Sequence, residues 1–151
     1  MKTLEIRRIL APTDFSEHSC HALSYARTFA NRWEAELHLL NVIEPAVFPT
    51  EAGLSPMGMI NLDNELAEAA DRAMAEMLKR EEIQGASTVT AIAHGRASSA
   101  IIEYARENAI DLIVIATHGR TGLEHLIFGS TAERVVRESP CPVLTVRPPD
   151  A

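Results

Sequence analysis

Residues 112–116 read Leu-Ile-Val-Ile-Ala, the most apolar stretch of the chain. A continuous apolar run rich in β-branched residues is typical of a strand in a parallel sheet that is buried on both faces. The chain then crosses a segment with glycines at 119, 122 and 129 and enters a helical pattern at 130–138. The stretch therefore predicts a βα unit of an α/β protein.

Short strand patterns alternate with longer helical patterns along the rest of the chain. Four further strand patterns occupy residues 9–11, 37–43, 89–93 and 143–146. Helical patterns separate them at residues 16–33, 61–82 and 98–108. Strands joined by helices require right-handed crossovers. The fold class expected is therefore α/β, a doubly wound five-stranded parallel sheet flanked by helices, Rossmann-like in architecture.

The first helical pattern predicts a buried stripe and a helix start. Its stripe consists of Leu23, Ala26, Ala30 and Trp33, which follow one another at spacings of three and four. Ser16 is a good N-cap for this helix.

A long connection leads to the second helix. Residues 44–59 contain three prolines and two glycines, and long loops in compact proteins are often functional or mobile. Two interpretations stay open: a flap near a binding site, or a plain variable connection. The helix that follows is expected to bury Leu62, Leu66, Ala69, Ala73 and Met77.

Composition narrows the class of protein. A chain of 151 residues with 46% apolar content predicts one domain, residues 1–151, with a real core. The net charge of −7 and the lack of a basic run argue against a nucleic-acid partner. No run of eighteen apolar residues and no signal peptide is visible, so we expect no membrane partner and a cytoplasmic location. Cys20 and Cys141 form no CxxC motif, which favours two thiols in a reducing compartment.

In a doubly wound sheet, ligands bind beyond the carboxyl ends of the strands. The positions to examine are Pro12–Asp14, Val42–Glu44, His94–Gly95 and Ala116–Gly119. No catalytic triad can be assembled from the sequence, and His18 and His21 lack a third metal ligand nearby. We therefore expect neither catalytic residues nor a metal centre.

The segment from 116 to 130 has the chemistry of an anion site. Backbone N–H groups at a helix start bind anions without side-chain charge, and glycine lets a phosphate approach the main chain closely. Arg120, with His118 or His125, could add positive potential. Neither GxxxxGK[ST] nor GxGxxG is present. The glycines could equally shape turns, and Ser130 with Glu133 fits a capping box that needs no ligand.

Several motifs in order resemble the universal stress protein family over essentially the whole chain. They are Ile9–Ser16, Leu39–Ile43, His118–Gly122, Phe128–Val136 and Pro140–Val146. The resemblance implies an adenine nucleotide alpha-hydrolase-like fold. It also implies a bound adenine nucleotide, ATP or a relative, with or without Mg²⁺, and a homodimer. Cyclic AMP stays an alternative, because the loop chemistry indicates a phosphate better than it indicates the number of phosphates.

ATP-binding members of that family carry Gly-x2-Gly-x9-Gly-Ser/Thr after the fourth strand. The second glycine falls here on Gly119, and the motif ends at Gly129 and Ser130, but its first position is Ala116. This departure adds a methyl group that could narrow a pocket without forbidding binding.

The resemblance also implies a set of nucleotide-binding residues. Pro12, Thr13 and Asp14 would lie beside the adenosine, and Val42 would pack on the adenine. Gly119, Gly129, Ser130 and Thr131 would hold the phosphates. The nucleotide-binding set is completed by Ala116, Thr117, His118 and Arg120. Without a ligand, Asp14 would be a turn or helix-entry residue and Val42 a core residue.

Three functions fit these observations. The first is a stress-response module that binds the nucleotide and changes its partner affinity. The second is a slow ATP hydrolase with Mg²⁺, which is disfavoured because only Asp14 is an obvious carboxylate near the expected site. The third is a nucleotide-free dimeric interaction protein, supported by Ala116. A homodimer would pair the edge strand Val143–Val146 with its copy.

Overall fold

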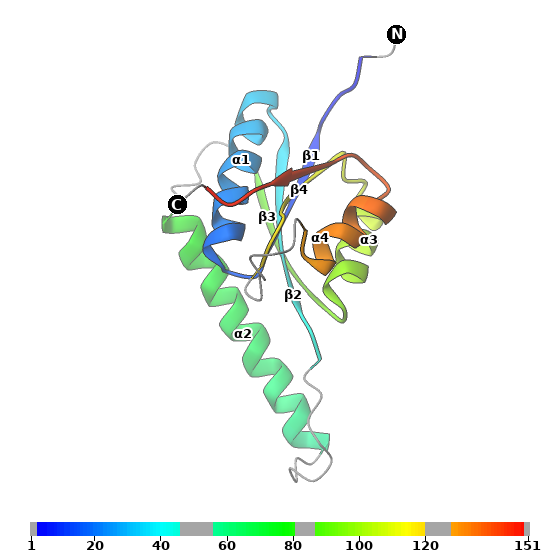
Figure 1. Ribbon diagram of the computed structural model, residues 1–151. Coiled ribbons are helices and arrows are strands. Elements are labelled where there is room, and N and C mark those ends of the chain that lie inside the picture. The colour runs from blue at the N-terminus through cyan, green and yellow to red at the C-terminus, as the bar shows by residue number, and fades with distance from the viewer. Residues whose placement is uncertain (1–2, 46–55, 81–86, 120–127, 150–151) are drawn as a thin grey trace.

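The computed structural model describes residues 3–45, 56–80, 87–119 and 128–149. Strands and helices alternate through these residues, as Figure 1 shows. In chain order they are β1 (Arg8–Thr13), α1 (Glu17–Trp33), β2 (Glu36–Ile43), α2 (Pro56–Arg80), β3 (Thr88–His94), α3 (Ala97–Glu107), β4 (Leu112–Ala116), α4 (Ser130–Glu138) and β5 (Val143–Val146). The five strands form one parallel sheet in the order β3-β2-β1-β4-β5. The predicted doubly wound parallel sheet is confirmed.

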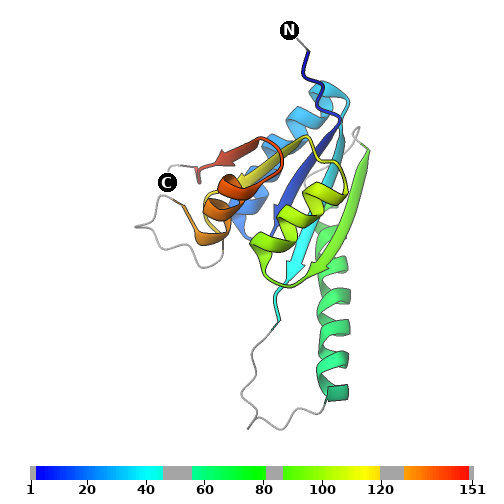
Figure 2. The ribbon, with the colours of Figure 1, turned by 90° about the vertical axis from the view of Figure 1, so that its right-hand side faces the viewer.

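Helices cover both faces of the sheet (Figures 1 and 2). On one face α1 and α2 pack on a cluster that includes Leu37, Leu39 and Val114. On the other, α3 and α4 pack on a cluster that includes Leu40 and Ile113. Successive residues of one strand therefore pack into the clusters on opposite faces of the sheet, which explains the continuous apolar runs in the sequence.

The ladder between β1 and β4 ends before either strand does. The pairing of β1 with β2 runs the full length from Arg8 to Thr13, whereas its ladder with β4 stops at Leu10. The carbonyl of Arg8 accepts from the N–H of Asp111, the residue before β4, so the backbone groups of every second residue, including Pro12, face β4. Proline has no N–H to donate there. The predicted strand 9–11 stopped short of Pro12; instead β1 continues to Thr13, and its ladder with β4 ends where the donor is missing.

Helix α1 confirms most of its predicted stripe. Leu23, Ala26 and Ala30 are buried, and the side chain of Ser16 caps the helix by accepting from the Ser19 N–H. The prediction for Trp33 is wrong, because its side chain is 46% exposed and stacks on Phe29. Trp33 is the last residue of the helix and lies beyond the part of the helix that packs on the core.

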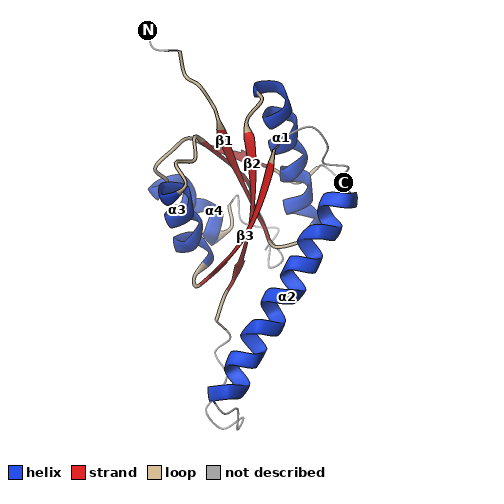
Figure 3. Cartoon of the chain, turned by 180° about the vertical axis from the view of Figure 1, so that it is seen from behind, coloured by secondary structure: helices blue, strands red, loops and turns tan. Residues whose placement is uncertain are grey.

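Helix α2 begins five residues earlier than the predicted position 61, at Pro56, a residue type favoured at helix starts. Its buried residues are Ala70, Met74 and Met77, so the stripe predicted through Leu66 and Ala69 is wrong except at Met77. Figure 3 shows the reason: the first half of α2 extends beyond the sheet and has no strand to pack on. Residues 46–55 of the predicted loop and the predicted helix end at 82 lie outside the described residues.

Two methionines of α2 give a matched test of this division. Met74 is 1% exposed in the core and Met59 is 43% exposed on the protruding half. We expect Met74→Ala to lower the free energy of unfolding by about 2–5 kcal/mol, because a buried thioether leaves a cavity. Met59→Ala should change it by less than about 0.5 kcal/mol. Urea denaturation of both variants measures the difference, and equal losses would contradict the packing of α2 described here.

Candidate functional site

A cavity of about 660 Å³ opens at the carboxyl ends of β1, β2 and β4. Its size suits a small-molecule ligand. Eleven of the twelve predicted site residues line it: Pro12, Thr13, Asp14, Val42, Ala116, Thr117, His118, Gly119, Gly129, Ser130 and Thr131. The twelfth, Arg120, lies outside the described residues. The cavity occupies the crevice between β1 and β4, which is the switch point of a doubly wound sheet.

The turn after β1 is held by its own hydroxyl and carboxylate groups. The Thr13 Oγ1 accepts from the Phe15 N–H at 3.0 Å, and an Asp14 carboxylate oxygen accepts from the Ser16 N–H at 3.0 Å. Phe15 takes a positive φ of 64°, a strained conformation for a bulky residue. On β2, the buried Asn41 donates to the Thr13 carbonyl at 2.8 Å. The position of Asp14 is therefore fixed by the fold.

Thr117 connects β4, β5 and α4. Its N–H donates to the Val146 carbonyl at 3.0 Å, and its carbonyl accepts from the Gly129 N–H at 2.7 Å. The side chain is 2% exposed, and its hydroxyl lies 2.9 Å from the Nδ1 of His118. These contacts bring the end of β4 and the start of α4 together, although twelve residues separate Thr117 from Ser130 in the chain.

Both glycines of the β4 motif lie close to other parts of the chain. A Cβ on Gly119 would lie 2.5 Å from Oδ2 of Asp14, so that carboxylate would have to shift, and a Cβ on Gly129 would make a tight contact of 3.2 Å with the Thr117 carbonyl oxygen. The φ of neither residue is in the left-handed region. Close approach of the chain to itself, rather than backbone freedom, favours glycine at these positions.

The start of α4 opens into the cavity without a side-chain cap. The helix begins at Ser130, and its N-cap is Gly129, so the predicted capping box led by Ser130 is wrong. Ser130 and Thr131 occupy the first turn, whose N–H groups have no acceptor within the helix. The turn lines the cavity, and the helix dipole places partial positive charge there. This arrangement can bind an anion.

The methyl group of Ala116 does not close the cavity. Ala116 packs partly buried against the core cluster on the α1 face and also lines the cavity. The space of about 660 Å³ is present with this methyl group in place.

Part of the cavity lining was not predicted from the sequence. The Val42–Glu44 segment was expected at the site, but not that the Glu44 carboxylate would line it and accept from the Ala97 N–H at 2.9 Å. The wall supplied by Leu66, Ala70 and Ala73 of α2 was also missed. The place of Glu44 directly after a strand was a usable signal, whereas the α2 wall depends on a helix position that only the fold supplies.

Three titratable side chains away from the cavity, those of His38, Tyr104 and Cys141, have protein hydrogen-bond partners. His38 is buried, with Nδ1 2.8 Å from the Tyr104 hydroxyl and Nε2 2.7 Å from Glu36. Burial, and then the nearby Glu36 charge, raises the pKa of Tyr104. Burial likewise raises the pKa of the Cys141 thiol, although a hydrogen bond with Ser139 opposes the shift. A protonated Cys141 is a poor nucleophile.

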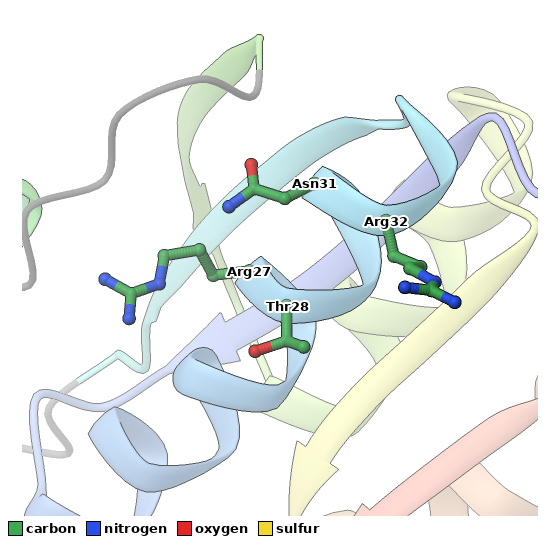
Figure 4. Close-up of a pocket in the computed structure, with 4 residues that line it drawn as sticks. All are labelled: Arg27, Thr28, Asn31 and Arg32. Atoms are coloured by element: carbon green, nitrogen blue, oxygen red, sulfur yellow. The ribbon is translucent and has the colours of Figure 1, made fainter.

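A second hollow lies on the outer side of α1 (Figure 4). All of its lining side chains come from this one helix: Arg27, Thr28, Asn31 and Arg32. No other element of the described ranges lines it, so it is an open surface feature, less enclosed than the cavity at the strand ends. Within the described ranges, no cluster of three metal-ligating side chains is present, and no helix is long and apolar enough to cross a membrane.

The fold and the cavity together define a doubly wound α/β protein with a ligand crevice at its switch point. Residues 5–147 match the model of the universal stress protein family. Universal stress protein MJ0531 of Methanocaldococcus jannaschii is 35% identical over 144 residues, which cover 95% of this chain and 83% of that protein. The chain belongs to the universal stress protein family.

Solved structures of the family share the fold. The universal stress protein UspA from Lactobacillus plantarum superposes with a TM-score of 0.81 at 32% identity, covering 96% of this chain and 100% of that one. A universal stress protein solved in complex with cAMP superposes at 0.61 with 24% identity, over 95% of this chain and 98% of its own. The adenine nucleotide alpha-hydrolase-like architecture expected from the sequence is therefore confirmed.

The contact between Gly119 and Asp14 makes a testable coupling. We expect Gly119→Ala to lower the free energy of unfolding by about 1–3 kcal/mol, because the new Cβ overlaps the Asp14 carboxylate. In an Asp14→Ala background the same substitution should cost about 1 kcal/mol less. Urea denaturation of the four proteins of this double-mutant cycle measures the coupling, and an equal cost in both backgrounds would disprove the overlap.

Proposed function

We propose that the protein binds ATP, or a related adenine nucleotide, in the cavity at the strand ends. It then acts as a regulatory or interaction module in the stress response. The observation that carries this proposal is the uncapped start of α4, which faces the cavity behind Gly129. Phosphates would accept from the first-turn N–H groups at Ser130 and Thr131.

The opposite part of the cavity supports an adenosine. Pro12 and Val42 supply apolar lining there, and Asp14 lies between the ends of β1 and β4 with its carboxylate fixed by Ser16. An apolar wall with a few placed polar groups is the usual composition of a cofactor site. A relative with this fold was solved with cAMP, so the architecture accommodates an adenine nucleotide.

The two rival functions have less support. A slow ATP hydrolase needs carboxylates to hold Mg²⁺ and to orient water. Asp14 and Glu44 are the two carboxylates that line the described cavity, and each already accepts a backbone N–H. A nucleotide-free interaction protein would require a closed pocket, and the cavity is open with Ala116 in place.

Calorimetric titration of nucleotide-stripped protein with ATP, ADP and cyclic AMP, each with Mg²⁺, tests the proposal. We expect binding by the wild type and an affinity lower by about tenfold or more in Gly129→Val, because the side chain meets the Thr117 carbonyl and crowds the phosphate position. Thr28→Val, on the outer side of α1, places the same valine side chain away from the cavity and should bind as the wild type does.

Thermal unfolding of the unliganded variants checks that they are folded. No heat with any of the three nucleotides in the wild type would overturn the proposal. Undiminished binding by a folded Gly129→Val would remove the start of α4 from the site.

We further propose a homodimer through β5. The strand pairs with β4 on one side and lies at the edge of the sheet. The carbonyls of Pro142 and Val146 accept from β4 and its following residue, so the intervening Thr145 directs its N–H away from β4. An outward row of donors and acceptors can pair with a second copy of itself.

Thr145→Pro tests this dimer without removing a bond to β4. Proline deletes the outward N–H of Thr145, so we expect the variant to elute as a monomer in size-exclusion chromatography with light scattering. Thr145→Val keeps the N–H and should remain dimeric. A dimeric Thr145→Pro protein, or a monomeric wild type, would contradict the proposed interface.

A further inference from the structure

Two helices start at the wall of the same cavity, and among the described residues a side-chain carboxylate accepts from the first-turn N–H groups of α3 alone. Helix α3 has no side-chain cap from its N-cap residue Arg96 and no acidic residue in its first turn. Instead Oε1 of Glu44 accepts from the Ala97 N–H at 2.9 Å, across 53 residues of sequence. In the described part of the chain no side chain caps α4, and the Glu133 of its first turn is paired with Arg137 at 3.6 Å. A ligand phosphate is therefore directed to α4, because Glu44 already accepts from the start of α3.

Glu44 is held in place both through the adjoining backbone and through its side chain. Glu44 directly follows β2, and the carbonyl of Ile43 accepts from the Gly95 N–H at 3.0 Å, which ties this strand end to the turn before α3. Oε1 is engaged by Ala97, and no described residue contacts Oε2 through a hydrogen bond. Oε2 is thus the carboxylate oxygen available to a ligand in the cavity.

Helix packing sets how far Glu44 lies from the phosphate end. Arg134 of α4 donates to the hydroxyls of Ser98 and Ser99 in the first turn of α3, at 3.2 and 3.0 Å, so the two helices lie side by side. Packed helices have axes roughly 8–10 Å apart. In a nucleotide the ribose hydroxyls lie next to the phosphates, whereas the 6-amino group of adenine lies at the far end of the molecule. The Glu44 carboxylate, bound at the start of α3, lies about one helix spacing from the start of α4. This separation suits the 6-amino group better than the ribose hydroxyls.

The geometry points to Glu44 as the residue that selects the 6-amino group of the base. This inference rests on the proposed function, with phosphates at the start of α4 and the base over Val42. Val42, Ile43 and Glu44 line one wall of the cavity, and a carboxylate oxygen accepts hydrogen bonds but donates none when ionised. Oε2 accepts from the amino group and gains nothing from a purine that lacks it.

Glu44→Gln separates this role from the structural one. The amide oxygen can keep the bond to the Ala97 N–H, which places the amide NH₂ where Oε2 was. A donor then faces the donor of adenine. The helix cap is retained while the selection is lost, so the variant is expected to fold with thermal stability close to that of the wild type.

The experiment compares ATP with purine riboside triphosphate, which differs from ATP only by lacking the 6-amino group. Calorimetry of the wild type should show ATP binding about tenfold more tightly, the magnitude of a partly exposed hydrogen bond to a charged group. In Glu44→Gln the ratio of the two affinities should fall to about one. Because both ligands carry the same phosphates, loss of the negative charge alone leaves the ratio unchanged.

Glu103→Gln, on the exposed side of α3, removes one negative charge away from the cavity and should keep the wild-type ratio. A wild type that binds ATP with no preference, or a preference that survives in Glu44→Gln, overturns the role of Glu44 and leaves the proposed function standing. A wild type that binds neither triphosphate overturns both.

Discussion

The end of the β1–β4 ladder at Leu10, at the switch point of the sheet, is the constraint on which the site depends. Beyond it, the chain after β1 enters a helix on one face of the sheet and the chain after β4 enters a helix on the other, which opens a crevice at the strand ends. Pro12 faces the β4 side and has no N–H to offer, so the ladder with β4 cannot continue through it. The chain keeps β1 on β2 up to Thr13, and the cavity lies at the ends of β1 and β4.

Contacts across this gap are made by loops rather than by the sheet. Asp14 comes within a side chain's width of Gly119, and Thr117 holds the start of α4 through the Gly129 N–H. Each contact leaves little room for a side chain on the glycine, so the two glycines and the carboxylate form one geometric unit. The strained φ of Phe15 belongs to the same unit, because it turns the chain from β1 into α1 while leaving Asp14 over the gap.

Local patterns in the sequence predicted the sheet, and the family resemblance supplied most of the residues that line the candidate cavity. The apolar run 112–116 and the glycine spacing after it identified β4 and the start of α4, whose bounds 130–138 agree with the structure. Trp33 and Leu66 were misplaced because the period of a helix does not tell where the sheet beneath it ends. The role of Glu44 depends on a contact across 53 residues with Ala97, which no local pattern encodes.

An acidic protein can still offer an anion site when the backbone supplies the positive charge. The described lining of the cavity contains Asp14 and Glu44 and neither lysine nor arginine. Glu44 neutralises α3, so the favourable potential for phosphate is confined to the uncapped turn of α4. Such a site distinguishes its two ends by hydrogen-bonding character: donors at α4, acceptors at the end of β2. A molecule with phosphates at one end and an amino group at the other matches this polarity, which is the chemical reason to favour an adenine nucleotide over other anions.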